Sequence, residues 1–580
     1  MSEIQFRVLY RQFLFRMVDL ELLSSAAQGD IHKLLGRFAA LLIWFSAAVA
    51  LAVLMSGGGG GPAGMITAWA MEHFLIATTI LVVGLFAVVS WDSMFPDRRD
   101  VLVLAPLPVR ARTLFFAKLT AVAAALGLSI FVLNAFTGLA APLAYGGAPR
   151  DLASMMGIRA VNPFLGAIRL FAAYWVTMAA AGVFTFGFVL SVQGIAQLLP
   201  RQKFLRVSAF LQIAAFVLFV SIYFMQLPFA SPTDLLSAQN QGTLVWLPSY
   251  WFFGKMQELN GSSLFFSGPD LLTQFTRRAW IGLGFSIAGA AAAYLICYFR
   301  TLRKIAEQPD ILPSRAGLRW LPRFGSALAT AVVQFSIRTL TRSRKHRVTI
   351  AFYLGIAFAI VLFISKAPDL QKTAGDPWRQ PTPPVLMATI LIMCSAIVGI
   401  RVAFAMPMEL RANWIFRVNP LRGGAEHARA ARRSLYSLSF IPIWLAAAAV
   451  LLWRWPWRQA AGHLAVMGLI GIALAEACLL SFRKIPFTCS YLPGKSHFHI
   501  AVMLYVWVAY LMGQGVDSEL RALNGDHRSL MMTLAVLAAV ACALRAYAFW
   551  TALAAEAIEF EDVPAPAIMV LGLNRDGSPV

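Results

Sequence analysis

The chain has 580 residues, of which 59% are hydrophobic and 13% are charged, and its formal net charge is +22. The charged share is about half that of an ordinary soluble chain, too little to coat a globule of this size in water. The basic residues lie in short segments between apolar blocks. This placement argues against nucleic-acid binding and favours a membrane protein. The five cysteines show no spacing typical of a disulfide framework or a zinc site.

The first segment, 1–37, predicts an amphipathic helix. Apolar residues recur at helical spacing on one face, namely Phe6, Leu9, Tyr10, Phe13, Met17 and Leu20. Arg7 and Arg11 fall on the opposite face. Such a helix is suited to lie in the headgroup layer of a membrane, where it also contacts lipid, and packing against other protein segments is the alternative. No cleavable signal peptide is evident, so we expect the first span to act as the insertion signal.

Twelve apolar blocks of about twenty residues follow, the length that crosses a hydrocarbon layer of roughly 30 Å as a helix. The predicted spans are 38–56, 72–90, 119–140, 170–193, 207–228, 279–299, 348–365, 384–406, 434–453, 460–482, 498–514 and 529–551. Most of the 49 Lys and Arg residues then fall on one side of the membrane. The positive-inside rule assigns that side, with both chain ends, to the cytoplasm. We therefore predict an all-α, multi-pass transmembrane helix bundle in the cytoplasmic (inner) cell membrane.

The two halves of the chain have similar layouts. A basic, aromatic segment precedes the first span of each half, at 1–37 and 324–347, and a longer loop follows the second span, at 91–118 and 407–433. This similarity predicts a 6+6 pseudo-repeat. The predicted parts are the interfacial helix at 1–37, a six-helix unit at 38–299, a basic cytoplasmic joint at 300–347, a second six-helix unit at 348–551 and a cytoplasmic tail at 552–580.

An aromatic run lies in the predicted outer segment 229–278, from Trp246 to Phe253. Aromatic side chains beside apolar spans are typical of the membrane–water interface, where their amphipathic rings sit at the level of the headgroups. We therefore expect this run to lie at the interface.

The loop at 91–118 has the most distinctive sequence. A dense mixed-charge turn is followed by a short apolar stretch bounded by prolines, and basic residues then precede the third span. A short helix along the cytoplasmic face with charges at both ends is suited to dock a soluble partner, whereas a basic loop that only sets topology is the alternative. The candidate residues of this loop are Asp97, Arg98, Arg99, Asp100, Pro106, Pro108, Arg112 and Lys118.

This stretch resembles the permeases of type-2 ATP-binding-cassette exporters. In that family the loop often contains an acidic turn, then Leu-Pro-Leu/Val-Pro or similar, then a basic residue, apolar residues and Ala-Lys. The matching residues here are Asp100, Pro106-Leu107-Pro108, Arg112, Phe115-Phe116-Ala117 and Lys118. Ala105 departs from the pattern, which prefers leucine. An interfacial helix before six spans also resembles the family, although many members are single six-span chains that dimerise.

The resemblance implies that the loop receives motion from a separate cytoplasmic ATPase chain. Export would pass between the two halves, or between two such chains in a homodimer. The second loop keeps the layout without the motif, and its candidate coupling residues are Glu409, Arg411, Trp414 and Arg417. The nearest match to a phosphate-binding loop, at 491–496, has Cys489 where the first glycine should stand and follows a span. With no catalytic, metal or cofactor motif evident, we expect no enzyme activity in this chain.

Ionisable residues inside membrane spans are costly and usually have a partner. Glu476 in the tenth span and Arg545 in the twelfth lie at similar depth. We predict an ion pair between them, which would either staple the two helices or take part in substrate passage.

Other functions stay open. A secondary transporter of the major facilitator kind also has six plus six spans. In that family, however, the loop between the second and third spans is short and carries a glycine-rich Gly…Asp-Arg pattern, whereas here no glycine lies near Asp97-Arg98-Arg99. A lipid-modifying membrane enzyme would need polar or acidic groups that converge at one membrane face. A membrane scaffold without transport is the remaining alternative.

Overall fold

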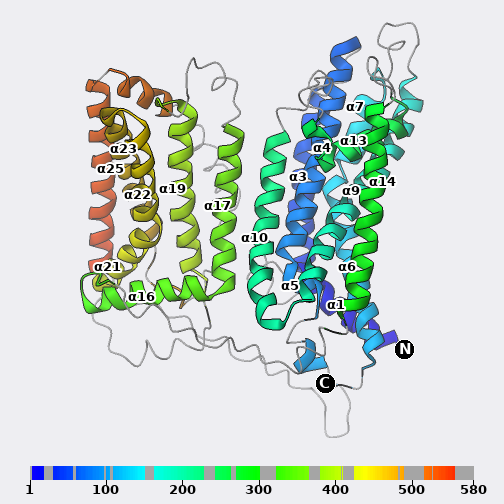
Figure 1. Cartoon of the computed structure of the whole chain (residues 1–580), viewed down its shortest axis with the longest axis horizontal. Helices are drawn as coiled ribbons and strands as arrows, with labels where there is room; N and C mark the ends of the chain where they lie inside the picture. Colours follow the sequence, from blue (N-terminus) through cyan, green and yellow to red (C-terminus); the bar gives the residue numbers. More distant parts are fainter. Residues whose placement is uncertain are drawn as a thin grey trace. The chain divides into compact units, whose positions relative to one another are not determined.

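The computed structural model describes residues 3–18, 31–56, 61–96, 100–104, 107, 109–149, 162–226, 242–262, 270–298, 300, 322–364, 379–406, 408, 424–480, 482, 484–488, 515–525 and 527–554. Within these ranges the regular structure is helical, with no strand. Contacts divide the chain into two compact units (Figure 1). The first is Met1–Arg315 with Phe358–Lys366 and Pro493–Ser496, and the second is Ala316–Ala357, Ala367–Leu492 and His497–Val580. The division at Arg315 falls inside the predicted joint.

Eleven of the described helices are long and apolar enough to cross a membrane. They cover Ala39–Ser56, Ala63–Val89, Ala111–Asn134, Pro163–Gln197, Val207–Gln226, Leu271–Cys297, Arg344–Leu362, Pro383–Phe404, Glu426–Arg454, Trp457–Leu479 and His527–Thr551. Each overlaps one predicted span, in the predicted order. The remaining predicted span, 498–514, lies outside the described residues. The prediction of a multi-pass helical bundle is therefore confirmed.

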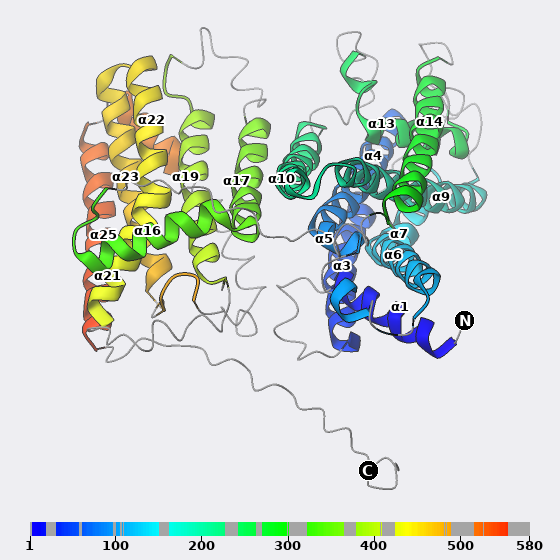
Figure 2. The same cartoon turned by 60° about the horizontal axis from the view of Figure 1, so that its bottom comes forward.

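The helices of the first unit pack mainly side by side (Figures 1 and 2). In chain order they are α1 (Glu3–Val18), α3 (Ile31–Ser56), α4 (Gly61–Val89), α5 (Trp91–Met94), the π-helix η1 (Asp100–Leu104), α6 (Ala111–Asn134), α7 (Thr137–Tyr145), α9 (Pro163–Gln197), α10 (Arg201–Gln226), α13 (Pro248–Asn260), α14 (Asp270–Ala292) and the π-helix η3 (Ala293–Cys297). Local sequence sets some boundaries. Asn162 caps α9 by accepting from the backbone N–H groups of Phe164 and Leu165. Gly261, with a φ of 73°, ends α13 in the left-handed conformation that glycine adopts without strain.

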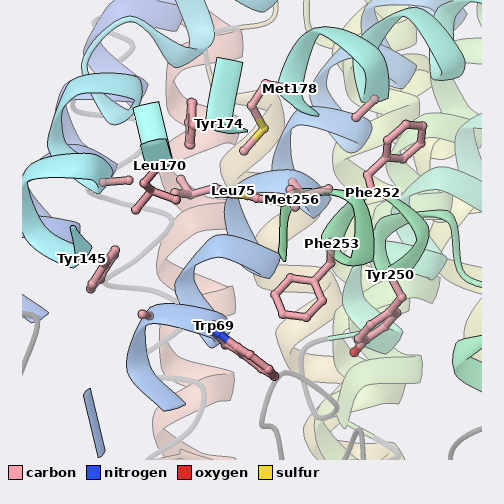
Figure 3. Close-up of a cluster of buried hydrophobic side chains, with 14 of the residues drawn as sticks. Trp69, Leu75, Tyr145, Leu170, Tyr174, Met178, Tyr250, Phe252, Phe253 and Met256 are labelled. Carbon is pink, nitrogen blue, oxygen red and sulfur yellow. The ribbon is translucent and has the colours of Figure 1, made fainter. Parts of the chain in front are cut away.

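The aromatic run of α13 lies in the core of the first unit. Tyr250, Phe252 and Phe253 are each at most 1% exposed, and Figure 3 shows them in one buried cluster, with Phe253 beside Trp69 of α4. The rings of Trp69 and Phe253 meet edge to face, with centroids 5.6 Å apart. Trp246 is 76% exposed. Three rings of the run are therefore packed inside the unit, because α13 inserts between α4, α9 and α14. That the run lies at the level of the membrane interface stays a prediction.

Helix α1 packs its apolar face on α6. Leu9 and Phe13 are buried against α6, where the small residues Ala117 and Ala121 leave room for them. Arg7 on the opposite face is exposed. The face that was predicted to enter the headgroup layer therefore contacts protein, as the alternative interpretation held.

The second unit contains α16 (Ala327–Arg342), α19 (Pro383–Phe404), α21 (Gly424–Leu435), the π-helix η5 (Tyr436–Phe440), α22 (Ile441–Arg454), α23 (Trp457–Leu479) and α25 (His527–Ala554). It also contains α17 (Arg344–Ile364) as far as Ala357, whereas the end of α17 from Phe358 is assigned to the first unit. A short helix at 515–523 precedes α25. Helix α16 starts at the N-cap Ser326, runs crosswise to the long helices of its unit (Figures 1 and 2) and packs on α21. The core of this unit forms around Met393, Ile397 and Phe404 of α19.

Candidate functional site

The turn that follows α4, residues 90–95, contains α5 and is hydrogen-bonded to α1. Ser90 Oγ donates a hydrogen bond to the carbonyl oxygen of Met17 at 3.1 Å. Ser93 Oγ donates to the carbonyl oxygen of Arg16 at 3.3 Å. These acceptors lie in the last turn of α1, whose carbonyls have no partner within the helix. The hydroxyls of the turn therefore satisfy the end of α1 and fix it against the end of α4.

The same turn is bonded to three further helices. Gln193 of α9 donates from Nε2 to the carbonyl oxygen of Trp91 at 2.6 Å, and the Trp91 indole donates to Ser208 Oγ of α10 at 2.9 Å. The hydroxyl of Tyr294, in η3, donates to the carbonyl oxygen of Met94 at 2.8 Å. Each bond contributes about 1 kcal/mol, and losing one partner would leave a buried polar group unsatisfied. The turn is thus held to α9, α10 and η3 as well as to α1.

A buried ion cluster lies where this turn meets α6. Lys118 Nζ is 2.8 Å from Asp100 Oδ2, and the two side chains are only 4% and 6% exposed. Arg16 contacts the other carboxylate oxygen of Asp100. Lys118 also donates to the carbonyl oxygen of Phe95 at 2.7 Å and lies 5.1 Å from the centroid of the Phe13 ring. The ammonium group therefore links α1, η1, α6 and the turn through one buried charge.

The predicted coupling-loop residues are only partly brought together. Asp100 and Lys118 meet each other inside the unit, where α1 covers them. Their part in coupling to an ATPase stays a prediction. Arg112 is exposed in the first turn of α6. The other predicted residues of both loops lie outside the described residues: Asp97, Arg98, Arg99, Pro106, Pro108, Glu409, Arg411, Trp414 and Arg417.

Glu476 has a different ion-pair partner from the one predicted. Its fully buried carboxylate lies 2.9 Å from Arg432 Nε and accepts a hydrogen bond from the Tyr436 hydroxyl at 2.8 Å. Arg545 is exposed on α25 and forms no ion pair with Glu476 in the described part of the chain. Arg432 and Tyr436 are four residues apart on one helical path, so both reach Glu476 from the same face. Depth in the membrane did not reveal which helix faces Glu476.

A polar cluster that the sequence did not predict ties α13 to α4. Glu72 is 2% exposed and accepts a hydrogen bond from Gln257 Nε2. His73 is 3% exposed, lies 3.1 Å from Ser249 Oγ through Nε2 and stacks on Tyr250 with ring centroids 4.1 Å apart. The sequence signal for this cluster was the adjacent pair of ionisable residues, Glu72 and His73. The predicted span began at Glu72, at the membrane edge, whereas α4 begins eleven residues earlier, at Gly61.

The fold and these sites define a multi-pass α-helical membrane protein with buried ionisable groups in both units. Among the described residues, no group of three or more His, Cys, Asp and Glu side chains is arranged to hold a metal ion. Comparison with known protein families, with curated proteins and with solved structures finds no match.

Proposed function

We propose that this chain is the permease subunit of an ATP-binding-cassette exporter, which moves a substrate across the cytoplasmic membrane with a separate ATPase chain. The observation that carries the proposal is the bonded turn after α4. A coupling element has to pass motion from a soluble partner to the membrane helices. Bonds from Ser90, Trp91 and Lys118 connect this turn to α1, α6, α9 and α10. A displacement of the turn would therefore move these helices together.

The start of α6 offers a surface for an acidic partner. Arg110 and Arg112 are both exposed at the N-terminal end of this helix. Positive charge is unfavourable there, by about 0.3–1 kcal/mol, because the helix dipole is positive at its N-terminus. An acidic group of the ATPase would relieve both charges. The excess of basic residues in the same set of loops supports placing this end in the cytoplasm.

The two units share one arrangement that supports the proposed 6+6 repeat. In the first unit α1 packs on α6, which begins the third span. In the second unit α16 packs on α21, which continues through η5 into α22 and so also begins the third span of its half. One chain would then supply both halves of the export path. The other assembly is a homodimer, and the mass of the purified complex distinguishes the two.

The proposal is tested by co-purification. The tagged chain is extracted in mild detergent from its native membrane, co-purifying proteins are identified and ATPase activity is measured. We expect a stoichiometric ATPase, and we expect Arg112→Glu to reduce the retained activity at least tenfold. Arg458→Glu is a matched control, because Arg458 is also exposed and is also the second residue of its helix, α23. Purification of the chain alone, without ATPase activity, would refute the proposal.

A secondary transporter is a second candidate, favoured by one observation. Glu72, Glu476 and Glu519 are buried carboxylates, at most 4% exposed, and such groups in membrane proteins often carry coupling protons. This candidate predicts that the chain alone, reconstituted in vesicles, carries protons across the membrane without ATP. The exporter proposal predicts no proton movement in the same vesicles.

A further inference from the structure

Lys255 of α13 is a buried cation without a counter-charge. It is 4% exposed, and its ammonium group lies 3.8 Å from the centroid of the Trp280 ring of α14. Glu258, one turn further along α13, is exposed and forms no ion pair with it in the described part of the chain. A buried cation is costly unless an anion or hydrogen-bond acceptors compensate it. The aromatic ring attracts the ammonium group but leaves its three N–H donors without an acceptor.

A second cation lies next to the same ring. Arg277 is three residues before Trp280 on α14, so the two side chains are neighbours on one face of the helix. Arg277 is exposed and Trp280 is 55% exposed, so the ammonium group over the ring lies near the surface. Lysine, arginine and the indole group of tryptophan can only donate hydrogen bonds. A ligand of this site must therefore present acceptor oxygens, and negative charge on them is favoured.

The other two basic residues around α13 already have partners. Arg169 Nε donates at 2.9 Å to a carbonyl oxygen near the end of α13. Arg278 Nη1 donates at 2.9 Å to a carbonyl oxygen just before the start of α13. Lys255 and Arg277 form no such bond among the described residues. These two cations are therefore the ones that can bind a ligand.

The site lies at the end of the first unit opposite the turn after α4. Helix α14 continues into η3, where Tyr294 bonds to this turn at Met94, whereas Arg277 is about two turns from the start of α14 at Asp270. Figure 1 shows α13 near this end of the unit, away from α1 and α5. Both cations belong to the predicted outer segment 229–278, on the side of a membrane where basic residues are uncommon.

An apolar face of α14 continues from the site along the helix. Ile281, Phe285 and Ile287 are 48%, 77% and 50% exposed and follow Trp280 within the same membrane span. A Cβ added at Gly284, between them, would meet no atom within 4 Å. The order along this face is therefore cations, then tryptophan, then apolar side chains. A lipid leaflet has the matching order of headgroups, interface and acyl chains.

We propose that Lys255, Arg277 and Trp280 form a binding site for the phosphate group of an anionic phospholipid in the leaflet at this end of the first unit. The phosphate oxygens accept hydrogen bonds from the ammonium and guanidinium groups, which gives the buried lysine its counter-charge. An acyl chain of the same lipid lies along the exposed face of α14. Inorganic phosphate offers the same oxygens, but only a lipid also covers Ile281 and Phe285.

Native mass spectrometry of the full chain in detergent tests the site with phosphatidylglycerol as the probe. We expect Lys255→Gln and Arg277→Gln each to weaken the tightest-bound lipid about tenfold, the effect of one lost charge-assisted hydrogen bond. Because Arg277 is exposed, its variant keeps the fold. Lys203→Gln is the matched control, since Lys203 is an exposed cation at the opposite end of the same unit, and it should bind as the wild type does. Unchanged binding in both site variants, or displacement of the lipid by inorganic phosphate, would overturn the proposal.

Photo-cross-linking identifies what covers the apolar face of α14. Phe285, which is 77% exposed, is replaced by benzoylphenylalanine, and the full chain is reconstituted in vesicles of phosphatidylglycerol and phosphatidylcholine. We expect cross-links to lipid with phosphatidylglycerol enriched over its share of the vesicle, and we expect Arg277→Gln in the same chain to remove this enrichment. A cross-link to a second copy of the chain or to another protein would show that the face is a protein interface and not a lipid site.

Discussion

Replacing Lys118 by methionine should destabilise the first unit by about 3–5 kcal/mol, the cost of leaving one member of a buried ion pair without its partner. Methionine fills most of the same volume, so packing on Phe13 is largely kept. The charge is not screened, because the side chains of Lys118 and Asp100 are 4% and 6% exposed. Arg16 still contacts Asp100, which places the expected loss at the lower end. The lost hydrogen bond to the carbonyl oxygen of Phe95, about 1–3 kcal/mol, is included in this range.

A double-mutant cycle separates the ion pair from the packing. Asp100→Asn alone should also destabilise the unit, and the double variant should lose less than the sum by about 1.5–3 kcal/mol, because neither charge is then buried without its partner. Denaturant unfolding in detergent micelles measures each free energy of unfolding. Lys203→Met is the control, since Lys203 is exposed in the same unit, and it should change the free energy by less than about 0.5 kcal/mol. Additive losses in the cycle would refute the assigned contact.

Two further predictions test the packing in each unit. Arg432→Met should destabilise the second unit by about 3 kcal/mol in the same unfolding assay, because Glu476 loses its ion-pair partner. Arg545→Met is the control and should cost less than about 0.5 kcal/mol. An equal loss for both variants would support the pair of Glu476 and Arg545 that the sequence predicted. Gly146→Ala should lower the melting temperature, because the new Cβ would lie 2.6 Å from a carbonyl oxygen and 2.7 Å from a backbone nitrogen. Gly127→Ala, where the new Cβ meets open space, should raise the free energy of unfolding by about 0.5–1 kcal/mol. A Gly127→Ala variant that is less stable than the Gly146→Ala variant would contradict the packing.

The membrane spans could be predicted because their signal is local. A run of apolar residues long enough to cross the bilayer is visible in one dimension, whatever it packs against. Eleven predicted spans accordingly match described helices. Their ends were less accurate, since α4 extends to Gly61 and α9 runs from Pro163 to Gln197, beyond the apolar core of each span. That error placed Glu72 at the membrane edge instead of inside a helix.

The partners of buried polar groups depended on the tertiary structure. Hydropathy gives the depth of Glu476 and Arg545 in the membrane but not the direction in which each side chain points, and Arg432 is the residue that faces Glu476. For the same reason the sequence does not show that Lys118 and Asp100 are buried under α1. His463 and Glu519 are 56 residues apart, and no sequence pattern indicates that they meet. Composition and periodicity determined that the chain is a helical membrane protein. Packing between segments distant in sequence decided which faces of the helices meet. Side-chain contacts depend on rotation about each helix axis as well as on position along it.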